Sequence, residues 1–326
     1  MLVIFMLNRN NCKIGYIRYN DRKYERFKDK IANIFRRIFI KVIIENIDNG
    51  IIILIPKYKF IKSTNKFVRK RIINQIKKYI KYENMQYIIL DKDLSFIEEN
   101  LRFIKEEFNK INILNGKYLM KNIISKLLEY IYNVNNKNIK LENIYIFVNE
   151  YTKNNIGIIE MLARKCKTVN IVTENLKYFR KLEDFLYNEG ILITVSNNKR
   201  KSAKNAKIII NMDFSKDVFE KYTINMNSII INLTNEKSFF ENTFRGVCIN
   251  NIEISIDKNV RCFYKEFYGD IKESLYLESI ILNKDYKYVE NKYEENNSKI
   301  SDLIGVRGKI QKNEFCESID KFLNLI

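Results

Sequence analysis

Short apolar runs alternate with amphipathic stretches along most of the 326-residue chain. In the first 135 residues, apolar and β-branched runs predict strands at residues 2–6, 39–47, 51–56, 85–90 and 111–114. Apolar positions at three- and four-residue spacing predict helices at residues 24–38, 64–82, 95–109 and 117–132. Strands mixed with helices in this way indicate an α/β domain.

Two of these predicted elements have specific local signals. Asn49-Gly50 separates two β-branched runs, and both residue types tolerate a positive φ, so the two runs are predicted to pair as a β-hairpin. Ser63 or Thr64 is a suitable N-cap for the helix that follows. Apolar residues recur every four positions along that helix, so one of its sides is predicted to be buried.

The most regular pattern lies between residues 141 and 252. Six short apolar runs there predict strands at residues 143–148, 168–173, 191–195, 207–212, 228–233 and 246–250. Helical patterns and one turn separate them, at residues 156–166, 176–188, 199–206 and 214–222. Continuous apolar strands separated by helices predict a doubly wound, mostly parallel sheet that is covered on both faces.

The asparagine-rich segment 133–140 is predicted to be a linker. The chain is therefore predicted to contain a basic α/β domain at residues 1–135, the doubly wound domain at residues 141–252 and a helical C-terminal extension at residues 253–326. In that extension, the pattern predicts helices at residues 263–282 and 313–325.

Residue types absent from the chain exclude several classes of chemistry. There is no His, so Ser-His-Asp and Cys-His nucleophiles, His-ligated metal sites and His general bases are excluded within this chain. The five Cys residues are widely spaced and form no C-x-x-C pair, which indicates reduced thiols and no structural metal site. No apolar run reaches eighteen residues, so we predict a cytoplasmic protein without a membrane span.

The formal net charge of +19 is distributed unevenly. Residues 1–140 have a balance of +17 and residues 141–326 a balance of +2. Within the first part, residues 57–81 contain ten basic residues and no acidic one. On a helical projection of residues 64–82, four lysines form a narrow arc away from the apolar side of the helix: Lys66, Lys70, Lys77 and Lys81. Such a face is suited to the phosphates of nucleic acid, and it also fits a solvated helix surface.

Polar residues follow most strands of the predicted doubly wound sheet, at the edge where such sheets bind ligands. Six strands in this alternation resemble the Rossmann-type NAD(P)-binding domain of the shikimate dehydrogenase and glutamyl-tRNA reductase group, over about residues 142–250. The resemblance implies a nucleotide-like cofactor, NAD(P), and an oxidoreductase-like activity.

The resemblance assigns cofactor contacts to specific positions. The glycine fingerprint should follow the first strand, where this chain has only Gly157 together with Asn149, Asn154 and Asn155. Ordinary dinucleotide binding is therefore in doubt, because asparagine side chains occupy space that a pyrophosphate needs. Further candidate ligand contacts at the carboxyl ends of later strands are Thr173, Glu174, Asn197 and Asp213. Glu174 is placed to contact ribose hydroxyls, or simply lies at a helix entry.

These observations leave three hypotheses for the function. The chain could bind a nucleotide or phosphorylated small molecule on its Rossmann-like domain, bind nucleic acid through its basic N-terminal domain, or serve as a non-catalytic scaffold. No motif places an acid–base pair, a nucleophile or a set of metal ligands, so no catalytic residue is assigned.

Overall fold

The computed structural model describes part of the chain, and the described residues are 14–19, 42–47, 50–55, 66–82, 85, 87–90, 104–108, 111–133, 138–236, 244–256, 273–282, 284, 286–295, 297–306 and 308–310. The chain divides into two compact units. The first comprises residues 1–115 and 261–279, and the second comprises residues 116–260 and 280–326. The domain boundaries expected from the sequence stay a prediction.

The first unit contains a five-stranded sheet in the order β2-β3-β1-β4-β5. Its strands are β1 (Ile14–Tyr19), β2 (Ile43–Ile47), β3 (Gly50–Ile55), β4 (Tyr87–Leu90) and β5 (Asn112–Ile113). β2 and β3 pair in antiparallel fashion with Ile47 opposite Gly50, which confirms the predicted hairpin. The other pairs are parallel. The apolar pattern did not single out β1, which lies at the centre of this sheet.

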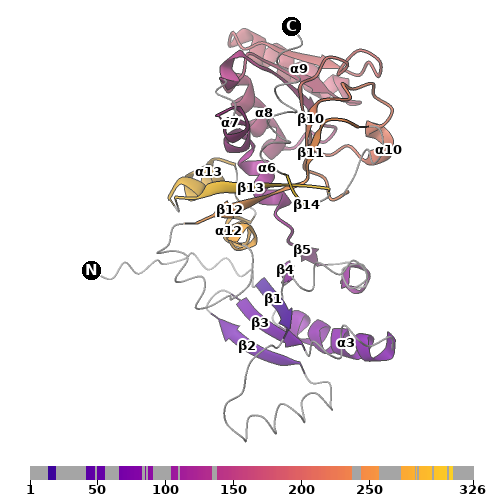
Figure 1. The fold of residues 1–326 in the computed structure, drawn as a ribbon, viewed down its shortest axis with the longest axis vertical. Coiled ribbons are helices and arrows are strands. Elements are labelled where there is room, and N and C mark those ends of the chain that lie inside the picture. The colour runs from indigo at the N-terminus through magenta and orange to yellow at the C-terminus, as the bar shows by residue number, and fades with distance from the viewer. Residues whose placement is uncertain are drawn as a thin grey trace, which may run out of the picture. The chain divides into compact units, whose positions relative to one another are not determined.

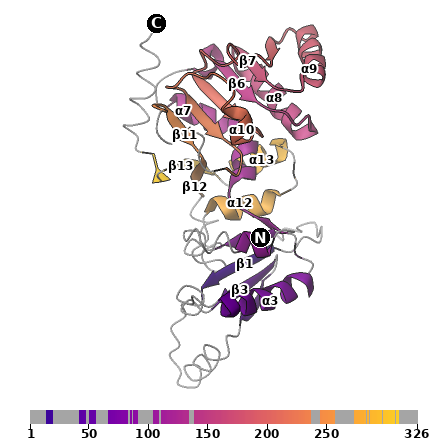
Figure 2. The same ribbon diagram turned by 90° about the vertical axis from the view of Figure 1, so that its right-hand side faces the viewer.

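Helix α3 (Lys66–Tyr82) packs on this sheet, as Figure 2 shows for β1 and β3. Its side chains Ile72, Ile76 and Ile80 are buried in one core with residues of the sheet, so the predicted apolar stripe is confirmed. The predicted helix at residues 95–109 is described only from 104 to 108, where residues 104–107 are helical. The elements predicted at residues 2–6 and 24–38 lie outside the described residues.

The second unit contains a six-stranded, wholly parallel sheet in the order β11-β10-β9-β6-β7-β8. Its strands are β6 (Asn143–Phe147), β7 (Thr168–Val172), β8 (Ile193–Ser196), β9 (Ile208–Asn211), β10 (Ile229–Asn232) and β11 (Val247–Ile249). This is the strand order of a doubly wound dinucleotide-binding sheet, with the order reversing between β6 and β9. All six strands coincide with predicted ones, and the Rossmann-like α/β architecture is confirmed.

Helices cover both faces of the parallel sheet. Figure 1 shows α8 (Lys153–Lys165) and α10 (Lys216–Phe219) on opposite sides of β10 and β11, while α9 (Leu176–Asn188) connects β7 to β8. The predicted helix at 117–132 is divided at Ile123 into α6 (Lys117–Asn122) and α7 (Ile124–Asn133). A one-turn 3-10 helix, η1 (Ile139–Leu141), leads into β6.

A third, antiparallel sheet in the second unit was not expected from the sequence. It consists of β12 (Asn251–Ser255), β13 (Lys299–Gly305) and β14 (Gly308–Lys309). The helix predicted at residues 263–282 is present as α12 (Glu273–Ile281) in the described part of that segment. α13 (Tyr286–Glu295) was not predicted, and the helix predicted at 313–325 lies outside the described residues. None of the helices within the described ranges is long and apolar enough to cross a bilayer.

Candidate functional site

The carboxyl ends of β9 and β10 are each closed by a buried asparagine. Both strands have the sequence Ile-Ile-Ile-Asn, and Asn211 and Asn232 are fully buried. The Asn211 amide accepts a hydrogen bond from the Phe214 backbone N–H and donates one to the Phe214 carbonyl, both at 3.0 Å. Asn232 accepts from the Thr234 N–H at 3.2 Å and donates to the Glu236 carbonyl at 2.7 Å. These side chains therefore fix the loops that leave the sheet.

A carboxylate lies at the point where the strand order reverses. Asp213, just after β9, accepts hydrogen bonds from the backbone N–H groups of Asn149 and Glu150, just after β6, at 2.7 and 2.8 Å. Each amide is bonded to a different oxygen of the carboxylate. In a dinucleotide-binding domain, the loop after the first strand is the one that contacts the pyrophosphate. Here two consecutive N–H groups of that loop, those of Asn149 and Glu150, are hydrogen-bonded to a carboxylate of the protein itself.

The side chain of Asn149 is hydrogen-bonded to the neighbouring loop, which follows β7. Its Oδ1 accepts hydrogen bonds from the Glu174 N–H at 2.8 Å and from the Thr173 hydroxyl at 3.3 Å. In return, the Asn175 side chain donates to the Asn149 carbonyl at 2.7 Å. The loops after β6 and β7 are therefore held together by side-chain amides, and the Glu174 side chain remains exposed.

The entry to α8 is also filled by polar side chains. Thr152 is the N-cap and accepts from the Asn155 N–H at 3.2 Å. Asn155 is fully buried and donates to the Glu150 carbonyl at 2.8 Å, whereas Asn154 is half-buried. Gly157 lies inside α8, beyond the strand-to-helix turn. The turn between β6 and α8 therefore contains no glycine.

Two lysines of α6, four residues apart, reach the same sheet edge. Lys117 donates from Nζ to the carbonyl of Asn232 at 2.5 Å and also to the carbonyl of Asn250. Burial lowers the pKa of Lys117 to about 8. Gly116 is the N-cap of this helix and has a φ of 86°, a left-handed conformation that favours glycine.

Lys121 lies near the carboxylate at the reversal point. Burial lowers its pKa, and the negative charges of Asp213 and Glu150 partly offset that effect. Burial raises the pKa of Asp213, while the two backbone hydrogen bonds and Lys121 oppose the increase. Partly buried groups of opposite charge at a strand edge are a common feature of ligand sites, and they also occur in structural networks.

The described cysteines do not provide a nucleophile. Burial raises the pKa of the Cys166 thiol to about 12 and that of the Cys248 thiol to about 11. Both thiols are half-buried and protonated at neutral pH, which disfavours a nucleophilic role. The other three cysteines lie outside the described residues.

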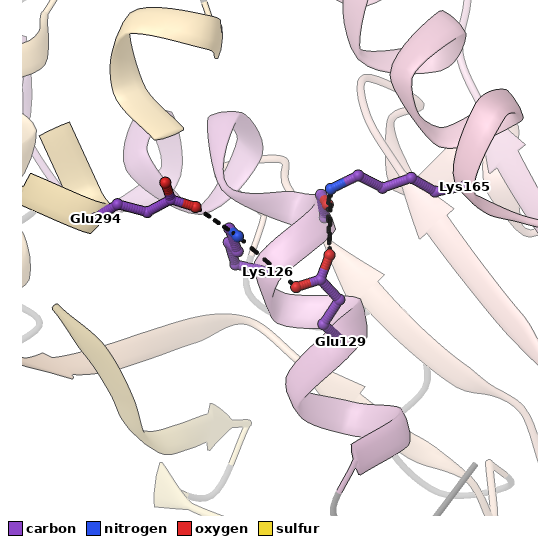
Figure 3. A network of polar contacts seen from close by, with 5 residues as sticks. Lys126, Glu129, Lys165 and Glu294 are labelled. Atoms are coloured by element: carbon purple, nitrogen blue, oxygen red, sulfur yellow. Dashed lines mark hydrogen bonds and ion pairs between the residues drawn. The ribbon is translucent and has the colours of Figure 1, made fainter. Parts of the chain in front are cut away.

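A second group of charges, shown in Figure 3, connects three helices away from this edge. Lys126 of α7 pairs with Glu294 of α13 at 2.7 Å, and Lys165 of α8 pairs with Glu129 of α7 at 3.2 Å. Lys165 also donates to the buried hydroxyl of Ser125 at 2.5 Å. All of these charged groups have partners in other helices, so we interpret the network as a structural connection.

In the first unit, the predicted basic residues of α3 differ in their surroundings. Lys70 and Lys81 are exposed, whereas Lys77 forms an ion pair with Glu107 at 2.6 Å and lies over the Phe108 ring. The side chain of Lys66 lies outside the described part of the chain. The exposed arc of α3 instead consists of Phe67, Lys70, Arg71, Asn74, Lys78, Lys81 and Tyr82.

The structure brings together most of the candidate residues of the second unit. Asn149, Thr173 and Glu174 belong to one hydrogen-bonded group at the sheet edge, and Asp213 joins it through the Asn149 N–H. Asn197 is exposed after β8, away from the strand-order reversal. The roles of these residues in ligand binding stay a prediction.

Sequence reasoning did not identify Lys117, Lys121 or the amide roles of Asn211 and Asn232. The lysines precede the parallel sheet in sequence, so nothing in the βαβ pattern placed them at its edge. The sequence does contain a signal that could have identified the two asparagines, because the same Ile-Ile-Ile-Asn sequence ends two strands.

No protein-family model and no curated protein sequence matches the chain. Similar solved structures include L-tryptophan dehydrogenase from Nostoc punctiforme, at 11% identity, 96% coverage of this chain, 88% coverage of that chain and a TM-score of 0.30. Ornithine transcarbamoylase from Giardia lamblia has 9% identity, 73% and 80% coverage and a TM-score of 0.30. Such low TM-scores carry no argument about activity. The Rossmann-like fold is supported by the strand order, and the narrower resemblance to the shikimate dehydrogenase group stays a prediction.

Proposed function

We propose that the second unit binds a small molecule with a single phosphate group at the carboxyl edge of its parallel sheet. The observation that carries this proposal is the position of Lys121, a partly buried cation beside the point where the strand order reverses. Doubly wound sheets bind ligands at this point. A phosphate there would meet a positive charge that is only partly solvated, which strengthens their attraction.

A nucleoside monophosphate or a sugar phosphate fits this proposal better than NAD(P). Two consecutive amides of the loop after β6, those of Asn149 and Glu150, are already bonded to Asp213, so these donors are not available to a pyrophosphate. A single phosphate next to Lys121 needs neither of those amides. The proposal includes no catalytic step, because no residue at this edge has a chemical role assigned by a motif.

Thermal unfolding in the presence of ligands tests the proposal. Three compounds are tested at 1–10 mM, about the range for a weak metabolite site: inorganic phosphate, AMP and glucose 6-phosphate. At least one of them should raise the Tm of the wild-type protein. Lys121→Met should abolish that increase, because the methionine side chain has similar length and no charge. Lys181→Met, on the exposed surface of α9, is the matched control and should retain it. If none of the three compounds raises the wild-type Tm, the proposal is wrong.

We propose a second candidate function, nucleic-acid binding, for the exposed side of α3, which we call the basic face. It consists of Lys70, Arg71, Lys78 and Lys81. The helix contains no acidic residue, and Phe67 and Tyr82 near its two ends are 75% and 82% exposed. Cations that attract phosphates, flanked by aromatic rings on which bases stack, favour single-stranded nucleic acid.

Fluorescence anisotropy with a labelled single-stranded RNA tests the basic face. Wild-type affinity should fall steeply as salt rises from 50 to 200 mM, because binding releases roughly 0.7 counterions per phosphate contacted. Replacing all four residues of the basic face by Gln should lower the affinity at least tenfold. A control with the same change of charge in the second unit replaces Lys177, Arg180, Lys181 and Lys204 by Gln. Equal losses in the two variants would show a non-specific charge effect and remove the basic face from consideration.

A further inference from the structure

The carboxylate of Asp213 has the geometry of a bound anion. Its two oxygens accept hydrogen bonds from consecutive backbone N–H groups, at Asn149 and Glu150, and a lysine, Lys121, lies nearby. Consecutive backbone N–H groups that converge on one point form an anion-binding arrangement, and phosphate groups commonly occupy it. Here the arrangement is intact, although the glycines that usually accompany it are missing.

We propose that Asp213 is a specificity-determining residue, which fills the diphosphate position of this Rossmann-like sheet and so excludes dinucleotides. The hydrogen bonds between Asn211 and Phe214 fix the loop that carries Asp213. Because the carboxylate is also covalently part of the chain, its effective concentration at the two amides is high. A diphosphate must displace it and leave a carboxylate without its hydrogen bonds in a partly buried position.

Because of the surrounding hydrogen bonds, we infer that the exclusion of a diphosphate depends on the Asp213 side chain alone. Asn149 is held by the loop after β7, and Asn155 holds the Glu150 carbonyl, so the two N–H groups keep their orientation independently of Asp213. Removing the carboxylate should therefore leave two oriented donors and Lys121 next to an opened space. The inference does not depend on the proposed monophosphate function, since it concerns ligands that the wild-type protein rejects.

Isothermal titration of the full-length protein with inorganic pyrophosphate, and separately with NAD, tests the inference. The Asp213→Ala variant should bind pyrophosphate at least tenfold more tightly than the wild-type protein. Asp213→Asn, which keeps the shape of the side chain but not its charge, provides a second variant and should also bind more tightly than wild type. Asp217→Ala removes an exposed carboxylate in the same unit and should behave as the wild-type protein does.

Two outcomes would overturn the inference. One is wild-type binding of pyrophosphate or NAD as tight as that of the variants. The other is that the variants fold, as judged by far-UV circular dichroism, yet bind pyrophosphate no more tightly than wild type. Neither outcome bears on the monophosphate proposal, which is tested with Asp213 unchanged and Lys121 replaced.

Discussion

At the scale of single residues, the charged side chain of Lys117 links helix α6 to the parallel sheet. Its Nζ bonds to carbonyls at the ends of two neighbouring strands, β10 and β11, and so attaches α6 to the sheet edge. The attachment requires burial, which lowers the pKa of Lys117 to about 8 from its ordinary value of 10.5. The ammonium form is therefore disfavoured in the folded protein relative to the unfolded chain.

Stability is predicted to depend on pH through this residue. Between about pH 8 and 10.5 the unfolded chain binds more protons at Lys117 than the folded protein does, so the free energy of unfolding rises with pH in that range. Urea unfolding at pH 7, 8, 9 and 10 should show that the free energy of unfolding of the wild-type protein, relative to that of Lys117→Met, rises by about 2–3 kcal/mol across this range. Lys181→Met is the exposed control. A difference that stays constant with pH would contradict the prediction.

At the scale of elements, α10 is held in place by aromatic packing. The helix has only four residues, too few to be stable by itself. Its Phe219 is fully buried, with the ring centroid 4.7 Å from that of Phe147 in β6, and Phe214 and Tyr222 surround the same ring. Tertiary contacts with the sheet therefore determine the position of this short helix.

Removing the Phe219 ring should destabilise the second unit. Phe219→Ala leaves a cavity beneath α10, and the expected loss of unfolding free energy is about 3–5 kcal/mol. The matched control, Phe185→Ala, removes a ring on α9 that is 52% exposed and should change the free energy by less than about 0.5 kcal/mol. Urea unfolding followed by far-UV circular dichroism measures both. Similar losses in the two variants would show that α10 does not depend on this cluster.

At the scale of the whole molecule, the parallel sheet could be predicted from the sequence because short, continuous segments of the chain specify its strands and connections. Each strand is a continuous apolar run, and each connection returns to the same sheet through a short segment. The antiparallel sheet could not be predicted in the same way. β12 and β13 pair although more than forty residues separate them, and their sequences mix polar with apolar residues because one face of each strand is less buried.

The candidate site was predictable only in part for a related reason. Polar residues after strands could be assigned to the sheet edge from the strand pattern, as for Asn149 and Asp213. Which side chain bonds to which amide depends on the order of strands in space, and β6 lies next to β9, which is distant in sequence. The approach of Lys121 depends in addition on the packing of α6, which no periodic pattern describes.

The paired asparagines that close β9 and β10 have a consequence at the level of the gene. Glycine codons begin with two guanines, whereas asparagine, isoleucine and lysine each have at least one codon that contains only adenine and thymine. The chain has 9 glycines, and the buried amides of Asn211 and Asn232 hold loops at an edge where many doubly wound sheets rely on glycine. A genome poor in guanine and cytosine can therefore encode this sheet edge almost entirely in its preferred triplets.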